Sequence, residues 1–178
     1  VAGMGADLFE SYCGSILATA ALGAAAFIDF PDAQVKAVIA PMLVAGLGAL
    51  LSVLGVYFVR VKEGADQRAL LHALDRGINT SAILVVIGSY LLLRLLGIEN
   101  SLGLWAAIVT GLVVGIVIGK ATEHYTSHSF KPTRGIAESS ETGPAAVIIS
   151  GIGTGMISTV IPVLAVASGI ILAYLFSS

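Results

Sequence analysis

The sequence predicts an all-α protein, a polytopic transmembrane helix bundle with five spans. Of its 178 residues, 57% are hydrophobic and only 11% are charged, whereas about 25% of the residues in a soluble domain are charged. The mean hydropathy is +0.97, and the apolar residues form five long runs, each near the roughly 20 residues that a membrane helix needs. The predicted spans are residues 1–28, 35–59, 78–96, 102–122 and 145–176.

Local features support the spans in order. The first carries no charge from Cys13 to Ile28. The second contains Pro41, which we place near the start of its helix, where proline is tolerated. The third is preceded by an amphipathic stretch, residues 65–76, that is expected to extend its helix. The fifth is long enough to tilt or to kink at Pro162.

The fourth and fifth spans carry small residues at intervals of four, which places them on one face of a helix. Such ladders let two membrane helices approach closely, so we expect a tightly packed bundle. The ladders consist of Gly111, Gly115 and Gly119 in the fourth span and of Gly151, Gly155 and Thr159 in the fifth.

Positive charge alternates between the connections. Seven of the nine Lys and Arg residues flank two of the loops, and two lie on the opposite side. Because Lys and Arg concentrate in cytoplasmic loops, residues 60–77 and 120–145 are predicted to be cytoplasmic. The first span then starts on the cytoplasmic side and the fifth ends outside. The seven are Arg60, Lys62, Arg68, Arg76, Lys120, Lys131 and Arg134, and the two are Lys36 and Arg94.

Charge, cysteine content and the two ends of the sequence indicate which partners and which kind of protein to expect. A net charge of -2 argues against a nucleic-acid partner. The single cysteine, Cys13, excludes an internal disulfide framework. The sequence starts without an initiator Met or a signal peptide and stops where a span ends. We therefore expect it to be an internal piece of a longer protein, with the other helices of that polypeptide and the lipid bilayer as its neighbours.

Three polar residues share one face of the first span: Asp7, Glu10 and Ser11. An ionised carboxylate at membrane depth costs about 2.5–3.5 kcal/mol on insertion scales, and such residues usually face a bundle interior and bind or relay an ion. Asp7 and Glu10 are therefore candidate ligands for Na⁺, or carriers of a proton. The alternative is that they are solvated at a helix end, which suits Asp7 better than Glu10.

Other polar features have simpler interpretations. His124 and His128 are four residues apart, as in a helical metal site, but only Glu123 accompanies them, and an interfacial helix end is the favoured interpretation. The glycine-rich run 151–156 has the wrong spacing for a dinucleotide-binding loop and is assigned to helix packing. Arg94 lies where its side chain can reach the interface, with a functional ion pair as the alternative.

Several stretches closely resemble the membrane-integral, ion-pumping inorganic pyrophosphatases. They are residues 1–12, VAGMGADLFESY, residues 119–127, GKATEHYTS, and residues 138–145, ESSETGPA. The likeness continues through the final span, so it covers essentially the whole chain.

The resemblance implies a primary ion pump. Members of this family are homodimers whose helices form an inner and an outer ring. They hydrolyse Mg²⁺-bound pyrophosphate on the cytosolic side and move H⁺ or Na⁺ outward, an orientation that agrees with the charge pattern. A prokaryotic inner membrane is the expected location.

By this resemblance the chain corresponds to the sixth to tenth helices, of which only the first belongs to the inner ring. The family's ligands for Mg²⁺ and pyrophosphate, its K⁺ determinant and the lysine of its ion gate lie outside such a segment. We therefore expect no catalytic and no substrate-binding residue here, and no activity from this chain alone.

The resemblance also implies that Asp7, Glu10 and Ser11 form half of the ion gate. A glutamate at Glu10 is similar to the Na⁺ pumps and to some bacterial proton pumps, whereas plant-type proton pumps place it one turn later, where this sequence has Gly14. We expect a Na⁺ pump. The alternatives are an H⁺ pump with the same gate position, an unrelated secondary transporter with an acidic site, and a structural module without activity.

Overall fold

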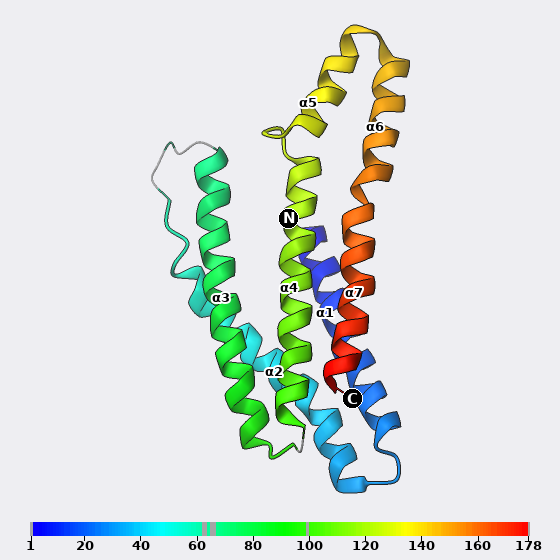
Figure 1. Ribbon diagram of the computed structural model, residues 1–178. Coiled ribbons are helices and arrows are strands. Elements are labelled where there is room, and N and C mark those ends of the chain that lie inside the picture. The colour runs from blue at the N-terminus through cyan, green and yellow to red at the C-terminus, as the bar shows by residue number, and fades with distance from the viewer. Residues whose placement is uncertain (1, 62–63, 65–66, 99, 178) are drawn as a thin grey trace. The chain divides into compact units, whose positions relative to one another are not determined.

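The computed structural model describes residues 2–61, 64, 67–98 and 100–177, which form helices joined by short connections, with no strand among them (Figure 1). They belong to two compact units, Val1–Trp105 and Ala106–Ser178, and each unit is described by itself. Lys62, which contributes to the predicted charge asymmetry, lies outside the described residues, as do residues 65 and 66 of the predicted amphipathic stretch.

Three long helices make up most of the first unit. They are α1 (Ala2–Ala26), α2 (Pro31–Val56) and α3 (Gln67–Leu95). Consecutive helices run antiparallel, and α2 packs against both α1 and α3 (Figure 1). The early start of α3 confirms that its helix extends ahead of the apolar span. Pro31 opens α2, where a missing N–H costs nothing, and Asp32 complements the helix dipole in the same turn.

Glycines allow these three helices to approach one another closely. A Cβ added to Gly23 of α1 would lie 2.8 Å from the carbonyl oxygen of Ala37 in α2. A Cβ added to Gly55 of α2 would collide with the hydroxyl of Ser81 in α3. A larger residue at Gly23 would push the helix backbones apart, and one at Gly55 would displace the Ser81 side chain.

The end of α3 is bound to the beginning of α4 (Ser101–Thr126) by an indole side chain. The Nε1 of Trp105 donates a 2.8 Å hydrogen bond to the carbonyl of Val86. The Trp105 ring also stands edge-on to Tyr90, with 5.6 Å between ring centroids. The guanidinium of Arg94 lies 5.4 Å from the centre of the Tyr90 ring. Arg94 is therefore held by a cation–π contact at the end of its helix.

The second unit contains the rest of α4 and a helical hairpin that follows it. Its elements are α5 (Lys131–Glu138), a 3₁₀ turn η1 (Ser139–Glu141), α6 (Pro144–Ser158) and α7 (Val160–Ser177). Both α5 and η1 contact α6. Gly143 takes a φ of 126° ahead of α6, a conformation that glycine adopts without steric cost. Farther along, α7 approaches α4, where a Cβ on Gly169 would lie 2.7 Å from a methyl of Val114.

Two prolines differ from the sequence-based expectation. Because α2 starts at Pro31 rather than at residue 35, Pro41 lies well inside the helix and not near its start. Membrane helices tolerate an interior proline where neighbouring groups satisfy the backbone. The expected kink at Pro162 takes the form of a break at Thr159. Pro162 has no N–H to donate to the Ser158 carbonyl, and its ring crowds that carbonyl, so α6 ends there.

The expected close packing of the glycine ladders is not found among the described residues. A Cβ added to any of five ladder glycines would meet no atom within 4 Å among the described residues. A spacing of four residues places glycines on one face of a helix but does not say what covers that face. The five are Gly111, Gly115, Gly119, Gly151 and Gly155.

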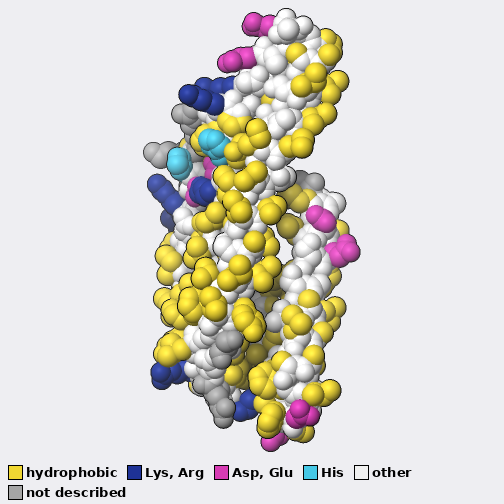
Figure 2. Space-filling view, turned by 45° about the vertical axis from the view of Figure 1, so that its right-hand side comes forward, with side chains coloured by type: hydrophobic (Ala, Val, Ile, Leu, Met, Phe, Trp, Pro, Cys, Tyr) yellow, Lys and Arg dark blue, Asp and Glu magenta, His cyan; other side chains and the backbone are white. Residues whose placement is uncertain are grey.

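Apolar side chains cover most of the face visible in Figure 2, and charged side chains are few on it. Phe9 is 70% exposed and Ile149 is 72% exposed, and many other large apolar residues resemble them. Five helical stretches are long and apolar enough to cross a membrane. Apolar surface on this scale is stable against lipid or other helices and not in water. The chain is therefore an integral membrane protein built from helices.

Candidate functional site

Asp7, Glu10 and Ser11 all lie in the first half of α1, and all three are exposed. Successive residues of an α-helix are about 100° apart around the axis, so the three fall within an arc of about 100°, with Asp7 in its middle. They therefore share one side of α1, called here the acidic face. Four carboxylate oxygens and one hydroxyl are presented together on it.

The opposite side of α1 is the side that packs on α2. The hydroxyl of Tyr12 donates a 2.6 Å hydrogen bond to the carbonyl of Ala45, and the Nε2 of Gln34 donates a 2.8 Å hydrogen bond to the carbonyl of Ala24. Tyr12 lies about 140° around the axis from Asp7. Because α2 anchors α1 from this side, the acidic face points away from α2.

Small residues continue the acidic face along α1. A Cβ added to Gly3 or Gly14 would meet no described atom within 4 Å. Beyond them the same side carries alanines that are exposed, so another helix can lie close against it. These alanines are Ala18, Ala21 and Ala25.

The hydroxyls along α1 differ in their hydrogen bonds. Ser15 donates to the carbonyl of Ser11, and Thr19 donates to the carbonyl of Ser15, each at 2.8 Å. Those two hydroxyls serve the backbone of their own helix. No such bond of the Ser11 hydroxyl occurs within the described part of the chain, so this oxygen remains available together with the carboxylates of Asp7 and Glu10.

The chemistry of the acidic face is that of half a cation site. Carboxylate and hydroxyl oxygens are hard ligands that suit Na⁺, and a carboxylate can also carry a proton. A complete site needs further oxygens or a positive partner, and the described residues place none of these on the acidic face.

The histidine pair does not form a metal centre in the described structure. Glu123 is bound instead to Lys120, with 3.0 Å between the charged atoms. The ring of His124 packs against Phe130, with 4.9 Å between centroids, and edge-on against Tyr125. No group of three or more His, Cys, Asp or Glu side chains able to hold a metal occurs among the described residues.

The sequence-based reasoning missed a pocket in the second unit where α4, α5 and α6 meet. Its lining includes Lys131 and Arg134 of α5 together with Ser150 and Thr154 of α6. The two hydroxyl residues are four apart in an otherwise apolar helix, so they share a face. That spacing was the available signal, but only the fold shows that the face meets α5.

Comparison with known proteins places this geometry in context. A protein of Bacteroides thetaiotaomicron is 59% identical over 180 residues, covering 100% of this chain and 24% of the relative, and it is provisionally named a K⁺-stimulated pyrophosphate-energized sodium pump. A Clostridium tetani protein with the same provisional name is 38% identical over 174 residues, covering 98% of this chain and 24% of its own length. The K⁺-insensitive pyrophosphate-energized proton pump of Methanosarcina mazei is 37% identical over 174 residues, covering 97% of this chain and 24% of the pump.

The chain thus spans about a quarter of the length of these curated relatives. The family model described as inorganic H⁺ pyrophosphatase matches all of it, residues 1–178. This match confirms the family indicated by residues 1–12 and the other resembling stretches, and the chain belongs to the inorganic H⁺ pyrophosphatase family.

Proposed function

We propose that the chain is part of a pyrophosphate-energised primary pump that couples cytosolic hydrolysis of Mg²⁺-pyrophosphate to outward transport of Na⁺. The observation that carries this proposal is the acidic face of α1. Asp7, Glu10 and Ser11 stand together on a bare, small-residue side of a membrane helix, opposite the side anchored by α2. In this proposal they form half of the ion gate.

The role of each residue follows from its chemistry. The Glu10 carboxylate, which lies next to the uncharged stretch from Cys13 to Ile28, is the ion-selective ligand. Asp7 adds a second carboxylate one turn nearer the helix start, and Ser11 adds a neutral oxygen. In the intact pump another helix lies against the acidic face and supplies the remaining half of the site. A shift of α1 relative to that helix alternately completes and opens the site, which couples hydrolysis to transport.

Proton transport is the second candidate, and a specific observation favours it. A proton pump of Methanosarcina mazei aligns with 97% of this chain, and a carboxylate pair suits a proton as well as Na⁺. The relatives named as sodium pumps are 59% and 38% identical and the proton pump is 37% identical. The 59% identity favours the Na⁺ assignment.

The substrate and its metal belong to other parts of the pump in this proposal. Mg²⁺ prefers several oxygen ligands in octahedral geometry, and the described residues contain no acidic cluster that fits it. The Mg²⁺ and pyrophosphate ligands are therefore assigned to the other helices of the same polypeptide. A K⁺ requirement, a homodimer and a prokaryotic inner membrane complete the proposal, and the purified chain alone should not hydrolyse pyrophosphate.

The deciding experiment uses the full-length protein in sealed vesicles. Pyrophosphate-driven uptake of radioactive Na⁺ is measured with and without a protonophore. A Na⁺ pump continues or accelerates when the proton gradient is collapsed. Absence of Na⁺ uptake together with acidification of the vesicle interior would establish the H⁺ alternative, and absence of both ion movements would reject the pump.

The orientation of the chain is tested separately. Single cysteines replace Asp29 and Ser140 in a Cys13→Ser background, and intact cells are treated with a membrane-impermeant thiol reagent. Because the loop at 120–145 is proposed to be cytoplasmic, we expect label at position 29 and none at position 140 until the cells are opened. The reverse pattern would invert the topology.

A further inference from the structure

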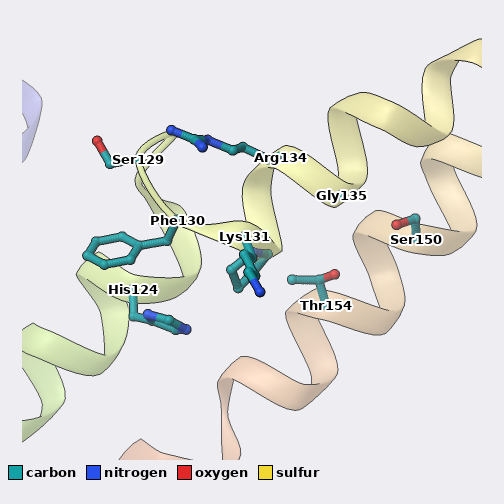
Figure 3. A pocket seen from close by; sticks show the side chains of 9 residues that line it. His124, Ser129, Phe130, Lys131, Arg134, Gly135, Ser150 and Thr154 are labelled. Atoms are coloured by element: carbon teal, nitrogen blue, oxygen red, sulfur yellow. The ribbon is translucent and has the colours of Figure 1, made fainter.

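An open pocket of about 810 Å³ lies in the second unit (Figure 3). The end of α4, the turn that follows it, α5 and α6 all contribute to its walls. Three side chains from these three helices point toward one another there, namely His124 of α4, Lys131 of α5 and Thr154 of α6 (Figure 3). We call this cavity the basic pocket.

The charge of the basic pocket is positive. Lys131 and Arg134 line it, and no carboxylate is among its lining residues. The nearest acidic residue along α4, Glu123, is bound to Lys120 at 3.0 Å. The Nε of Arg134 donates a 3.0 Å hydrogen bond to the carbonyl of His128, which fixes the guanidinium beside the turn. In Figure 3 the Arg134 side chain is directed away from Thr154, so Lys131 is the cation at the centre. A site with a central cation and no acid favours an anion.

Hydroxyl groups complete the donor set. Ser129 of the turn and Ser150 and Thr154 of α6 also line the pocket. Lys and Arg supply charge-assisted hydrogen bonds, and hydroxyls supply neutral ones, a mixture that suits the several oxygens of a phosphate group. The chemistry of the pocket is therefore that of a phosphate site.

The depth of the pocket in the membrane follows from helix lengths. Each residue of a helix adds about 1.5 Å, so His124 lies about 35 Å along α4 from Ser101. A bilayer has a hydrocarbon core of about 30 Å and a thickness of about 40–45 Å with headgroups. The α4 wall of the pocket is therefore long enough to reach the level of the lipid phosphates.

Apolar surface begins where the pocket ends. On α4 the side that holds His124 continues toward the hydrocarbon as Val117 and Val113, which are 42% and 51% exposed. On α6 the side that holds Thr154 continues as Ile157, which is 59% exposed. A free phosphate gains nothing from these side chains, whereas a lipid can lay its acyl chains along them.

We infer that the basic pocket binds the headgroup phosphate of an anionic phospholipid. Basic pockets between membrane helices on the cytoplasmic side recognise such headgroups. Lys131 provides the charge at the centre, Thr154 and Ser150 provide neutral donors, and the exposed apolar sides of α4 and α6 receive the acyl chains. This assignment rests on the proposed cytoplasmic side of residues 120–145, and it is independent of whether the pump moves Na⁺ or H⁺.

The test measures lipid binding to the full-length protein. Delipidated protein in detergent is titrated with phosphatidylglycerol or with phosphatidylcholine, and bound lipid is counted by native mass spectrometry. Lys131→Gln should weaken phosphatidylglycerol binding about fivefold, since a basic residue near an anionic headgroup contributes about that factor. Phosphatidylcholine binding should change little, and Lys131→Arg should bind phosphatidylglycerol as the natural protein does.

A matched control is Lys120→Gln, which removes the same charge near the end of the neighbouring helix α4, from a residue that does not line the pocket. It should retain phosphatidylglycerol binding. Lys131 is exposed, so its replacement should leave the fold intact, and thermal unfolding of each variant verifies this. Equal binding by the Lys131→Gln and Lys120→Gln variants would overturn the site, as would equal affinity for both lipids.

Competition with inorganic phosphate distinguishes a lipid headgroup phosphate from a free phosphate ion in the pocket. If inorganic phosphate displaces phosphatidylglycerol at matching concentrations, the pocket holds a soluble anion and the lipid assignment is wrong. We expect inorganic phosphate to need a large excess, because it lacks the acyl chains.

Discussion

The helices of the first unit and the helices α4 and α6 use their small residues in different ways. Gly23 and Gly55 lie directly against a neighbouring helix of the same chain, where no side chain fits. Gly115 and Gly155 have the regular spacing expected of a packing face, yet no described atom lies near them. Regular spacing of glycines thus marks a face on which another helix can pack. It does not show whether that other helix belongs to this chain.

The acidic face of α1 belongs to the second kind. It combines glycines and alanines with Asp7 and Glu10 and lies away from α2. Packed faces hold the described helices together, and we propose that open faces lined by small residues receive the remaining helices of the pump. On this view a substitution on a packed face should change stability, and a substitution on an open face should change function or assembly.

The largest effect is expected at Glu10. In the full-length pump, Glu10→Ala should abolish or uncouple transport and weaken the activation of hydrolysis by Na⁺, because a charged ligand is lost while the helix is kept. Glu10→Asp should retain part of both functions. Hydrolysis and ion uptake are measured against Na⁺ concentration, with Thr19→Ala as a control on the same helix. Wild-type Na⁺ activation and transport in Glu10→Ala would show that Glu10 is only a solvated helix residue.

The next effect is expected at Gly23. Gly23→Ala places a Cβ 2.8 Å from the Ala37 carbonyl, and that backbone atom moves only if α1 and α2 separate. Overpacking of this kind costs about 1–3 kcal/mol. The free energy of unfolding of the full-length protein in detergent should fall accordingly. An unchanged or increased value would mean that the two helices are not closely packed there.

A smaller loss is expected for Tyr12→Phe. It removes the 2.6 Å hydrogen bond to the Ala45 carbonyl and keeps the ring. A net hydrogen bond contributes about 0.5–1.5 kcal/mol, so unfolding in the same assay should become easier by about that amount. Tyr57→Phe is the matched control, because Tyr57 is 73% exposed. If the two changes have equal effects, the Tyr12 hydrogen bond does not help α2 to anchor α1.

The smallest effect on this chain itself is expected at Gly115. Gly115→Ala meets no described atom, and alanine is better than glycine in a helix interior by about 0.8–1 kcal/mol. The purified chain should therefore become slightly more resistant to unfolding, as judged by circular dichroism during a denaturant titration in detergent. If Gly115→Ala destabilises the purified chain as much as Gly23→Ala does, the Gly115 face is packed rather than open.

The sequence was sufficient for the helical class and for the five apolar helices, because hydrophobic runs are a local property. It also singled out Asp7 and Glu10, since charge in an apolar helix is conspicuous without any structure. Their role in transport remains a prediction. Helix boundaries were less predictable. Pro41 lies inside α2 because the helix starts at Pro31, which is four residues earlier than hydropathy alone indicates. Contacts between helices could not be predicted from local sequence either.

The basic pocket was not predicted from the sequence because it depends on contacts between helices. Its residues come from three helices and are spaced over about one sixth of the chain. Each alone reads as an ordinary interfacial residue, and only the return of α5 toward α6 brings them together. The glycine ladders were predicted to pack closely, and that prediction was wrong for the described residues. Their regular spacing does not show which helix, if any, packs against them.

The break between α6 and α7 has a mechanical consequence. A continuous helix bends as a stiff elastic rod, but here the Ser158 carbonyl lacks its usual donor because residue 162 is proline. The hydroxyls of Ser158 and Thr159 bond to carbonyls three residues back, at 2.7 and 2.8 Å, and so reinforce the end of α6 rather than the joint. The hydrogen-bond ladder is therefore interrupted at Thr159. Because a break of this kind bends more easily than a continuous helix, α6 and α7 can change their angle there.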